Sequence, residues 1–259
     1  MTHFKIIEYA ERILAFAYRR FVRPLMPSDG HVIYSGIATF EKRWGDKHLS
    51  HKWRPVALHS LDDVPEYEAA LATGLRIHVK LGDRVVVVGG GIGVTATIAA
   101  LEAGPDGSVE CFEGAREGVS AIGQTAVANG VAGRLTVHHA VVARSISVYG
   151  EEPLGSVVNP ADLPHCDVLE LDCEGAEVDI LQQMTIRPRV ILVETHGVYG
   201  APTELVSALL HQIGYHVTDL GAAEPRYKTL CDERDIRVVV GLRNMTNQKP
   251  KQTCKHTNI

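Results

Sequence analysis

Paired cysteines, long apolar runs and an excess of positive charge are all missing from this chain of 259 residues. Its five cysteines include no Cys-x-x-Cys pair, which argues against a disulfide framework or a zinc site. No stretch reaches the roughly 18 apolar residues that a membrane-spanning helix needs. Charged residues interrupt the apolar positions of the N-terminal segment, so no signal peptide is expected. These absences favour a reducing cytoplasm as the location of the protein.

The composition is that of an ordinary globular domain. Apolar residues make up 45% of the chain and charged residues 22%, which is enough apolar material for one core. The formal net charge of −5 provides no positive field to hold a polyanion, so nucleic acid is not an expected partner. The length suits one α/β domain with an N-terminal extension.

Residues 1–29 contain a predicted amphipathic helix over positions 3–26. Apolar side chains such as Phe4, Ile7 and Leu14 recur at helical spacing, and Pro24 and Pro27 disfavour its continuation. The wide apolar face and the basic end of this helix leave three alternatives open. The helix would pack on the core domain, pair two subunits in a homodimer, or make peripheral contact with an anionic membrane surface.

Residues 30–80 are interpreted as a lead-in segment or a cap on the substrate side, with a hairpin expected at 31–40 and a helix at 62–80. From 81 to 243 strands alternate with helices, which predicts a Rossmann-like, mostly parallel sheet with helices on both faces. The expected strands are 84–88, 108–112, 135–138, 167–171, 190–193, 217–220 and 236–242, and the clearest helices 94–103, 116–129 and 203–213. Residues 244–259 are expected to be a disordered tail.

A glycine-rich turn follows the first of these strands, in Val85-Val-Val-Val-Gly-Gly-Gly-Ile-Gly93. Glycine permits positive φ and lets a ligand approach the backbone, and the helix after the turn offers free N–H groups. Gly89, Gly91 and Gly93 are therefore candidate cofactor-binding residues. Glu113, at the end of the next strand, is placed to accept hydrogen bonds from both hydroxyls of a ribose.

These two features also fit an NAD- or FAD-dependent oxidoreductase, because Gly91-x-Gly93-x-x-Ala96 satisfies the dinucleotide pattern with alanine in third place. Against that alternative, no tyrosine of the chain has a lysine four residues later, as a catalytic Tyr-x-x-x-Lys pair requires. A non-catalytic Rossmann-like module is a third alternative. The glycine turn alone does not separate the three.

The segments after residue 160 are more specific. Asp172-x-Glu174-Gly175-Ala176-Glu177 precedes an amphipathic helix, and the next strand ends in Glu194-x-His196. This combination resembles the FkbM family of S-adenosylmethionine-dependent methyltransferases. The Val-Gly-x-x-Ile-Gly turn at 88–93 and the pair Phe112-Glu113 also resemble that family. The likeness covers about residues 81–243.

The resemblance implies a class I methyltransferase sheet with an antiparallel last strand, S-adenosyl-L-methionine as cofactor, and O-methylation of a hydroxyl on a sugar, glycan or other small molecule. Contacts to the cofactor carry over to Gly89, Gly91, Gly93 and Glu113. The chain departs from the pattern at Val87, where many relatives have Asp. Any contact that this acid makes to the cofactor is then lost or supplied elsewhere.

The candidate catalytic residues are Asp172, Glu174 and His196, which follow neighbouring strands at their carboxyl ends, where open α/β sheets place their ligands. A hydroxyl acceptor must lose its proton, and histidine suits a general base because its ordinary pKa is about 6.5. His196 is therefore the preferred candidate for the base. The same three residues could bind a divalent metal, but the sequence does not require one. Alternatively, Glu174, Glu177 and Glu194 cap helices or pair with Arg187 and Arg189.

Overall fold

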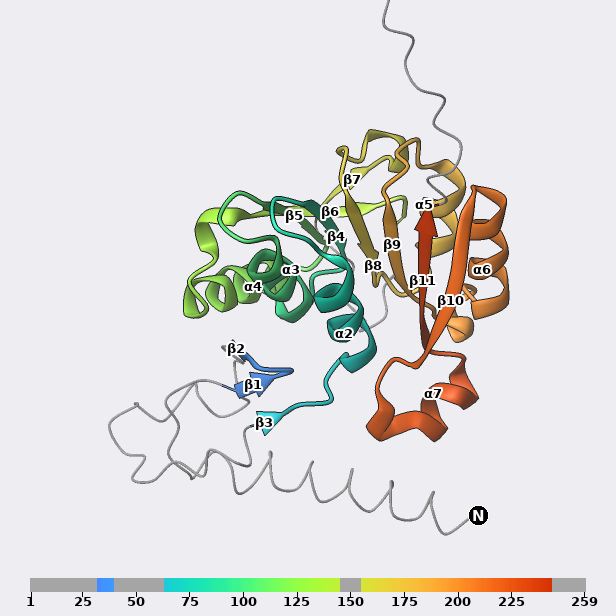
Figure 1. Ribbon diagram of the computed structural model, residues 1–259, viewed down its shortest axis with the longest axis horizontal. Helices are drawn as coiled ribbons and strands as arrows, with labels where there is room; N and C mark the ends of the chain where they lie inside the picture. Colours follow the sequence, from blue (N-terminus) through green and yellow to red (C-terminus); the bar gives the residue numbers. More distant parts are fainter. Residues whose placement is uncertain (1–31, 40–62, 145–154, 244–259) are drawn as a thin grey trace, which may run out of the picture.

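An eight-stranded sheet forms the centre of the protein (Figure 1). The computed structural model describes residues 32–39, 63–144 and 155–243. The strands are β4 Arg84–Val88, β5 Ser108–Glu113, β6 Leu135–Val142, β7 Ser156–Val158, β8 Val168–Leu171, β9 Val190–Glu194, β10 Tyr215–Ala222 and β11 Arg237–Arg243. Their order across the sheet is β10-β11-β9-β8-β4-β5-β6-β7.

All neighbouring strands from β9 to β7 are parallel, whereas β11 is antiparallel to both β9 and β10. The predicted mostly parallel sheet with an antiparallel last strand is therefore confirmed. From β4 the chain proceeds outward through β5, β6 and β7, and then returns to β8 on the other side of β4. Ligands of open α/β sheets bind outside the carboxyl ends of strands at such a switch point. A ligand-binding site is thus expected at the carboxyl ends of β4 and β8.

Helices cover both faces of the sheet (Figure 1). One core contains buried side chains of α2 Ala69–His78, α3 Val94–Ala103 and α4 Arg116–Ala128, and the other those of α5 Glu177–Gln183 and α6 Thr203–Gln212. Within β4, Val85 and Val87 belong to the first core and Val86 and Val88 to the second. A strand buried on both faces needs apolar residues throughout, which explains its run of valines.

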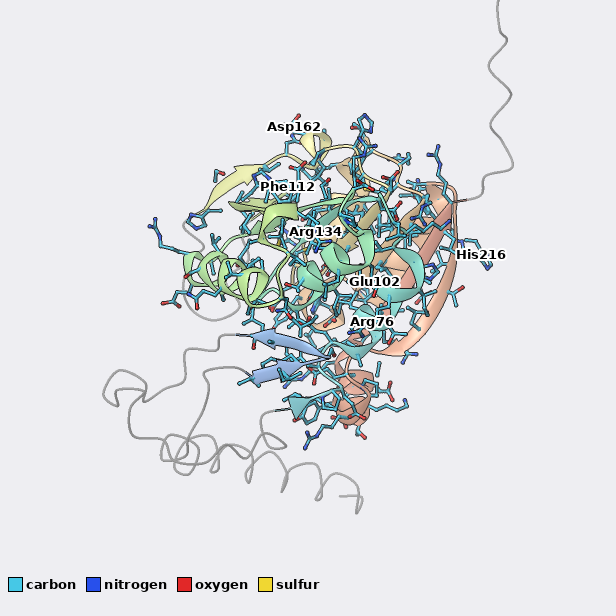
Figure 2. The ribbon with its side chains drawn as sticks, turned by 60° about the vertical axis from the view of Figure 1, so that its left-hand side comes forward. Arg76, Glu102, Phe112, Arg134, Asp162 and His216 are labelled. Carbon is cyan, nitrogen blue, oxygen red and sulfur yellow. The ribbon has the colours of Figure 1, made fainter. Side chains whose placement is uncertain are left out.

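The lead-in segment places a small sheet and α2 beside the main sheet. The expected hairpin is confirmed, because β1 Val32–Tyr34 pairs antiparallel with β2 Ile37–Thr39 around Ser35 and Gly36. The helix expected over 62–80 was wrong in its first part: β3 Asp63–Val64 pairs with β1, and α2 begins only at Ala69. Arg76 of α2 points toward the hairpin and donates a hydrogen bond to the carbonyl of Ser35 (Figure 2).

Several short elements were not predicted. They are β7, α7 Lys228–Arg234, and the 3-10 turns Ala132–Arg134, Pro160–Asp162, Gly197–Tyr199 and Pro225–Tyr227. The N-terminal helix and the polar tail fall outside the described residues. In the part of the chain that the structure describes, no helix is both long and apolar enough to span a bilayer.

Gly89→Ala tests the packing of the turn after β4. A Cβ on Gly89 would lie 1.7 Å from the carbonyl oxygen of Asp172, and its φ of +92° disfavours any other residue. We expect a loss of about 2–5 kcal/mol of folding free energy, from backbone strain and overpacking together. Urea unfolding measures it.

Gly123→Ala is the matched control, because Gly123 lies within α4 and a Cβ there has no neighbour within 4 Å in the part of the chain that the structure describes. This substitution should stabilise the protein by about 0.5–1 kcal/mol, the usual gain when alanine replaces glycine inside a helix. If Gly89→Ala unfolds at the wild-type urea concentration, the described contact between the two strand ends is wrong.

Candidate active site

The three glycines of the turn have different surroundings. A Cβ on Gly93 would lie 2.8 Å from the Cα of Ile122, so this glycine lets α4 approach the start of α3. Gly89 lets the end of β4 approach Asp172. Gly91, with φ +51°, has no heavy atom of the described residues within 4 Å of the position that a Cβ would occupy. Open space for a ligand therefore lies beside Gly91, while Gly89 and Gly93 shape the turn through close packing.

Glu113 ends β5 beside this turn. Its carboxylate accepts hydrogen bonds from the backbone N–H of Gly91 at 2.9 Å and of Ala115 at 2.7 Å. A carboxylate has about four lone-pair positions, so two remain for a ligand. Glu113 is thus fixed against the glycine turn.

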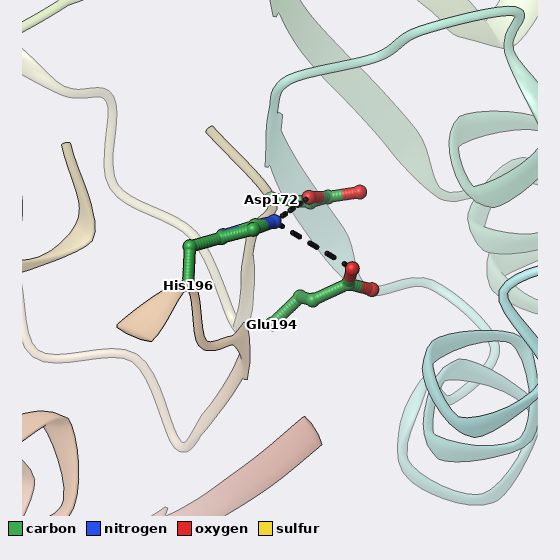
Figure 3. A group of neighbouring side chains, drawn as sticks. All are labelled: Asp172, Glu194 and His196. Carbon is green, nitrogen blue, oxygen red and sulfur yellow. Dashed lines mark ion pairs between the residues drawn. The ribbon is translucent and has the colours of Figure 1, made fainter. Parts of the chain in front are cut away.

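The acidic residues and the histidine come together at the carboxyl ends of β8 and β9 (Figure 3). Leu171 of β8 is paired with Val193 of β9, so Asp172 and Glu194 follow at neighbouring positions. The Nε2 atom of His196 lies 3.5 Å from Oδ1 of Asp172 and 3.6 Å from Oε1 of Glu194. These three residues form the Asp172–Glu194–His196 cluster.

Glu177 holds the other side of the imidazole. Its Oε1 lies 2.8 Å from Nδ1 of His196, and the Glu177 side chain is fully buried. The same carboxylate accepts hydrogen bonds from the backbone N–H of Cys173 at 3.1 Å and of Gly175 at 2.7 Å. The loop between β8 and α5 therefore orients His196 through a buried acceptor.

Burial and crowding shift the proton equilibria of the cluster. Burial raises the pKa of Asp172 to about 7, and His196 opposes this while Glu177 and Glu174 add to it. Burial also raises the pKa of Glu194 well above its ordinary value. Burial lowers the pKa of His196, but its hydrogen bond to Glu177 and the charge of Asp172 outweigh this and raise the pKa overall. Asp172 is therefore the residue of the cluster whose pKa lies near neutral pH.

Two further carboxyl groups border the cluster and were missed from the sequence. Glu68, at the start of α2, has its pKa raised to about 8 by burial and by the charge of Asp172. Glu170 of β8 is fully buried, and burial and Asp172 raise its pKa as well. Glu170 was detectable in principle, because it lies two residues before Asp172 and so faces the same side of the sheet. Glu68 had no such signal.

Glu174, the third candidate catalytic residue, lies in the loop after Asp172 with a left-handed φ of +55°. Its charge raises the pKa of both Asp172 and His196. The alternative pairing of the acids with Arg187 and Arg189 is wrong for Glu177 and Glu194. Arg187 donates to backbone carbonyls, and Arg189 pairs with Asp83.

Glu177→Ala should destabilise the protein strongly. It removes a buried acceptor from His196 and from two backbone N–H groups, and breaking a buried ion pair from one side typically costs about 3–5 kcal/mol. Glu204→Ala, at an exposed position of α6, is the control and should stay within about 0.5 kcal/mol of the wild type. Equal urea midpoints for the two variants would show that Glu177 does not hold His196 in this way.

No family model matches this sequence, and no curated protein matches it. Several solved structures, in contrast, are similar to this chain. An S-adenosylmethionine-dependent O-methyltransferase from Thermotoga maritima is 17% identical, with a TM-score of 0.46 over 72% of this chain and 68% of the other. A methyltransferase from Geobacter sulfurreducens is 19% identical, with a TM-score of 0.45 over 68% and 77%. Aeropyrum pernix fibrillarin, solved with bound S-adenosyl-L-methionine, is 16% identical, with a TM-score of 0.45 over 68% and 76%.

Proposed function

We propose that the protein is an S-adenosylmethionine-dependent methyltransferase of the FkbM type, which methylates a hydroxyl group on a sugar, glycan or other small molecule. The observation that carries the proposal is the position of the acidic cluster. Gly89 is packed directly against the backbone of Asp172, so the cluster borders the glycine turn. A cluster of acidic side chains with raised pKa values disfavours the further negative charge of the pyrophosphate of NAD or FAD and favours a cationic sulfonium, which would keep these side chains ionised.

The residues present fit this cofactor. Gly91 borders open space, and Glu113 beside it retains acceptor positions for ribose hydroxyls. The first turn of α3 follows Gly93 and presents free N–H groups. The resemblance to the FkbM family adds support, because Glu177 from one half of the motif contacts His196 from the other.

The chemistry asks little of the protein beyond alignment and activation of the acceptor. S-adenosyl-L-methionine supplies a methyl group on a sulfonium, which is already a good leaving group. The chain must hold the acceptor oxygen in line with that methyl group and favour loss of the hydroxyl proton. We assign this task to Asp172, Glu174 and His196, which follow β8 and β9 at the carboxyl edge of the sheet. Nucleic acid remains an unexpected acceptor at a net charge of −5.

Binding calorimetry on the full-length protein tests the cofactor. S-adenosyl-L-methionine or its demethylated product should bind, and NAD and FAD should not. Glu113→Ala should weaken this binding by about 1.5–3 kcal/mol, the range for hydrogen bonds to a charged group. Glu117→Ala, an exposed acid in the first turn of α4, should leave the affinity unchanged. Binding of NAD without binding of S-adenosyl-L-methionine would reject the proposed function.

The catalytic assignment is tested by transfer of a labelled methyl group to an extract of the native cell. Asp172→Asn and His196→Ala should each lower the rate by about 10²–10⁴-fold, the usual contribution of a group that assists proton transfer. Their affinity for S-adenosyl-L-methionine should stay within a few fold, because Glu113 and the glycine turn hold the cofactor.

His216→Ala is the matched control, since His216 lies exposed on β10 (Figure 2). It should transfer methyl groups at the wild-type rate. If His196→Ala also does so, His196 has no part in activating the acceptor.

A further inference from the structure

The Asp172–Glu194–His196 cluster has one feature that proton transfer alone does not explain. Glu177 is an acceptor for two backbone N–H groups and for Nδ1 of His196, so the proton of the neutral imidazole lies on Nδ1. The lone pair on Nε2 then faces the oxygens of Asp172 and Glu194. When both acids are ionised beside this neutral imidazole, three electron-pair donors point at one another.

The distances between these donors are too long for good hydrogen bonds. Nε2 lies 3.5 Å from Asp172 and 3.6 Å from Glu194, whereas hydrogen bonds of this kind measure about 2.7–3.2 Å. All three ligand atoms lie within 4.8 Å of one another. Two atoms that each lie about 2.1 Å from one tetrahedral ion are about 3.4 Å apart. The two distances from Nε2 are close to the spacing of ligands around a shared cation.

A separate observation points the same way. Glu194 is 9% exposed, and its Oε2 is buried without a hydrogen-bond partner among the described residues. Its other oxygen, Oε1, is the one that faces Nε2 of His196 (Figure 3). A buried carboxyl oxygen without a partner is costly unless a proton or a cation compensates it. The Asp172 side chain retains 18% exposure, so the cluster is accessible from that side.

We propose that the Asp172–Glu194–His196 cluster binds one divalent transition-metal ion. One imidazole and two carboxylates form a mixed nitrogen and oxygen donor set, which suits Mn²⁺ or Zn²⁺ better than Ca²⁺ or Mg²⁺. Glu177 is a positioning residue for this ion, because a carboxylate on the distal nitrogen fixes the orientation of a ligating histidine.

The role of the ion rests on the proposed function, whereas its binding does not. A cation held by three protein ligands can take the acceptor hydroxyl as a further ligand. It would then stabilise the developing negative charge on that oxygen and favour release of its proton to solvent. In this arrangement His196 and Asp172 act as ligands and not as the direct proton acceptor.

The test uses the full-length protein after treatment with a chelator and dialysis, with Mn²⁺ as the probe. Calorimetry and the loss of the free-ion signal in electron paramagnetic resonance should show one bound Mn²⁺ per chain. Glu177→Gln should weaken the affinity by about 10–100-fold, as for other residues that orient a ligand. Glu194→Gln and His196→Gln should weaken it at least as much, and Glu204→Gln, an exposed acid on α6, should not change it.

The outcomes are separable. Binding of S-adenosyl-L-methionine and a far-ultraviolet circular dichroism spectrum like that of the wild type report that a variant has folded, and His196→Gln serves if Glu194→Gln does not fold. Failure of the wild type to bind stoichiometric Mn²⁺, or equal affinity in Glu194→Gln and Glu204→Gln, overturns the metal site. Mn²⁺ binding by a protein that does not bind S-adenosyl-L-methionine would support the metal site and reject the proposed function. Undiminished methyl transfer after chelation would overturn the role of the ion.

Discussion

The close approach of two strand ends at the switch point is the constraint on which the site depends. β4 and β8 are parallel neighbours whose carboxyl ends lie side by side, and the chain between them forms β5, β6 and β7. Gly89 permits the two backbones to come closer than any side chain would allow. A turn that offers open space at Gly91 therefore lies next to a loop that begins with Asp172. One steric requirement thus brings the glycine turn and the loop that begins with Asp172 together.

Charge is the second organising factor, and it follows from the first. Because Glu170 of β8 and Asp172, two residues later, face the same side and Glu194 ends β9, carboxyl groups accumulate on one side of the sheet. Glu68 joins them from α2, and the pKa values of all four are raised. Such a site stabilises whatever positive charge enters it, be it a proton, a sulfonium or a metal ion. Glu177 determines how the imidazole of His196 is oriented toward these carboxyl groups.

The elements with a strong local signal could be predicted from the sequence. The bounds of β4 and α3 match the expected 84–88 and 94–103, because a valine run and a glycine turn mark them without tertiary information. The antiparallel pairing at β11 and the positions of Asp172 and His196 at strand ends followed from the family resemblance and from strand spacing. The start of α2 was misplaced because the pairing of β3 with β1, a contact distant in sequence, overrides the helical pattern before Ala69.

The parts that could not be predicted are those in which a side chain selects its partner. In the sequence, nothing distinguishes the roles of the three acidic residues Glu177, Glu194 and Asp172. Only the packing of the folded chain makes Glu177 the fully buried hydrogen-bond partner of Nδ1 and leaves the other two facing Nε2. That division decides the chemistry. An imidazole whose Nδ1 is held by a carboxylate has one nitrogen left for function. Whether that nitrogen takes a proton or a metal ion then depends on the two carboxylates that face it, and their separation from it exceeds a hydrogen bond. The sequence specifies the residues of this site, but the distances between their atoms determine what the site can bind.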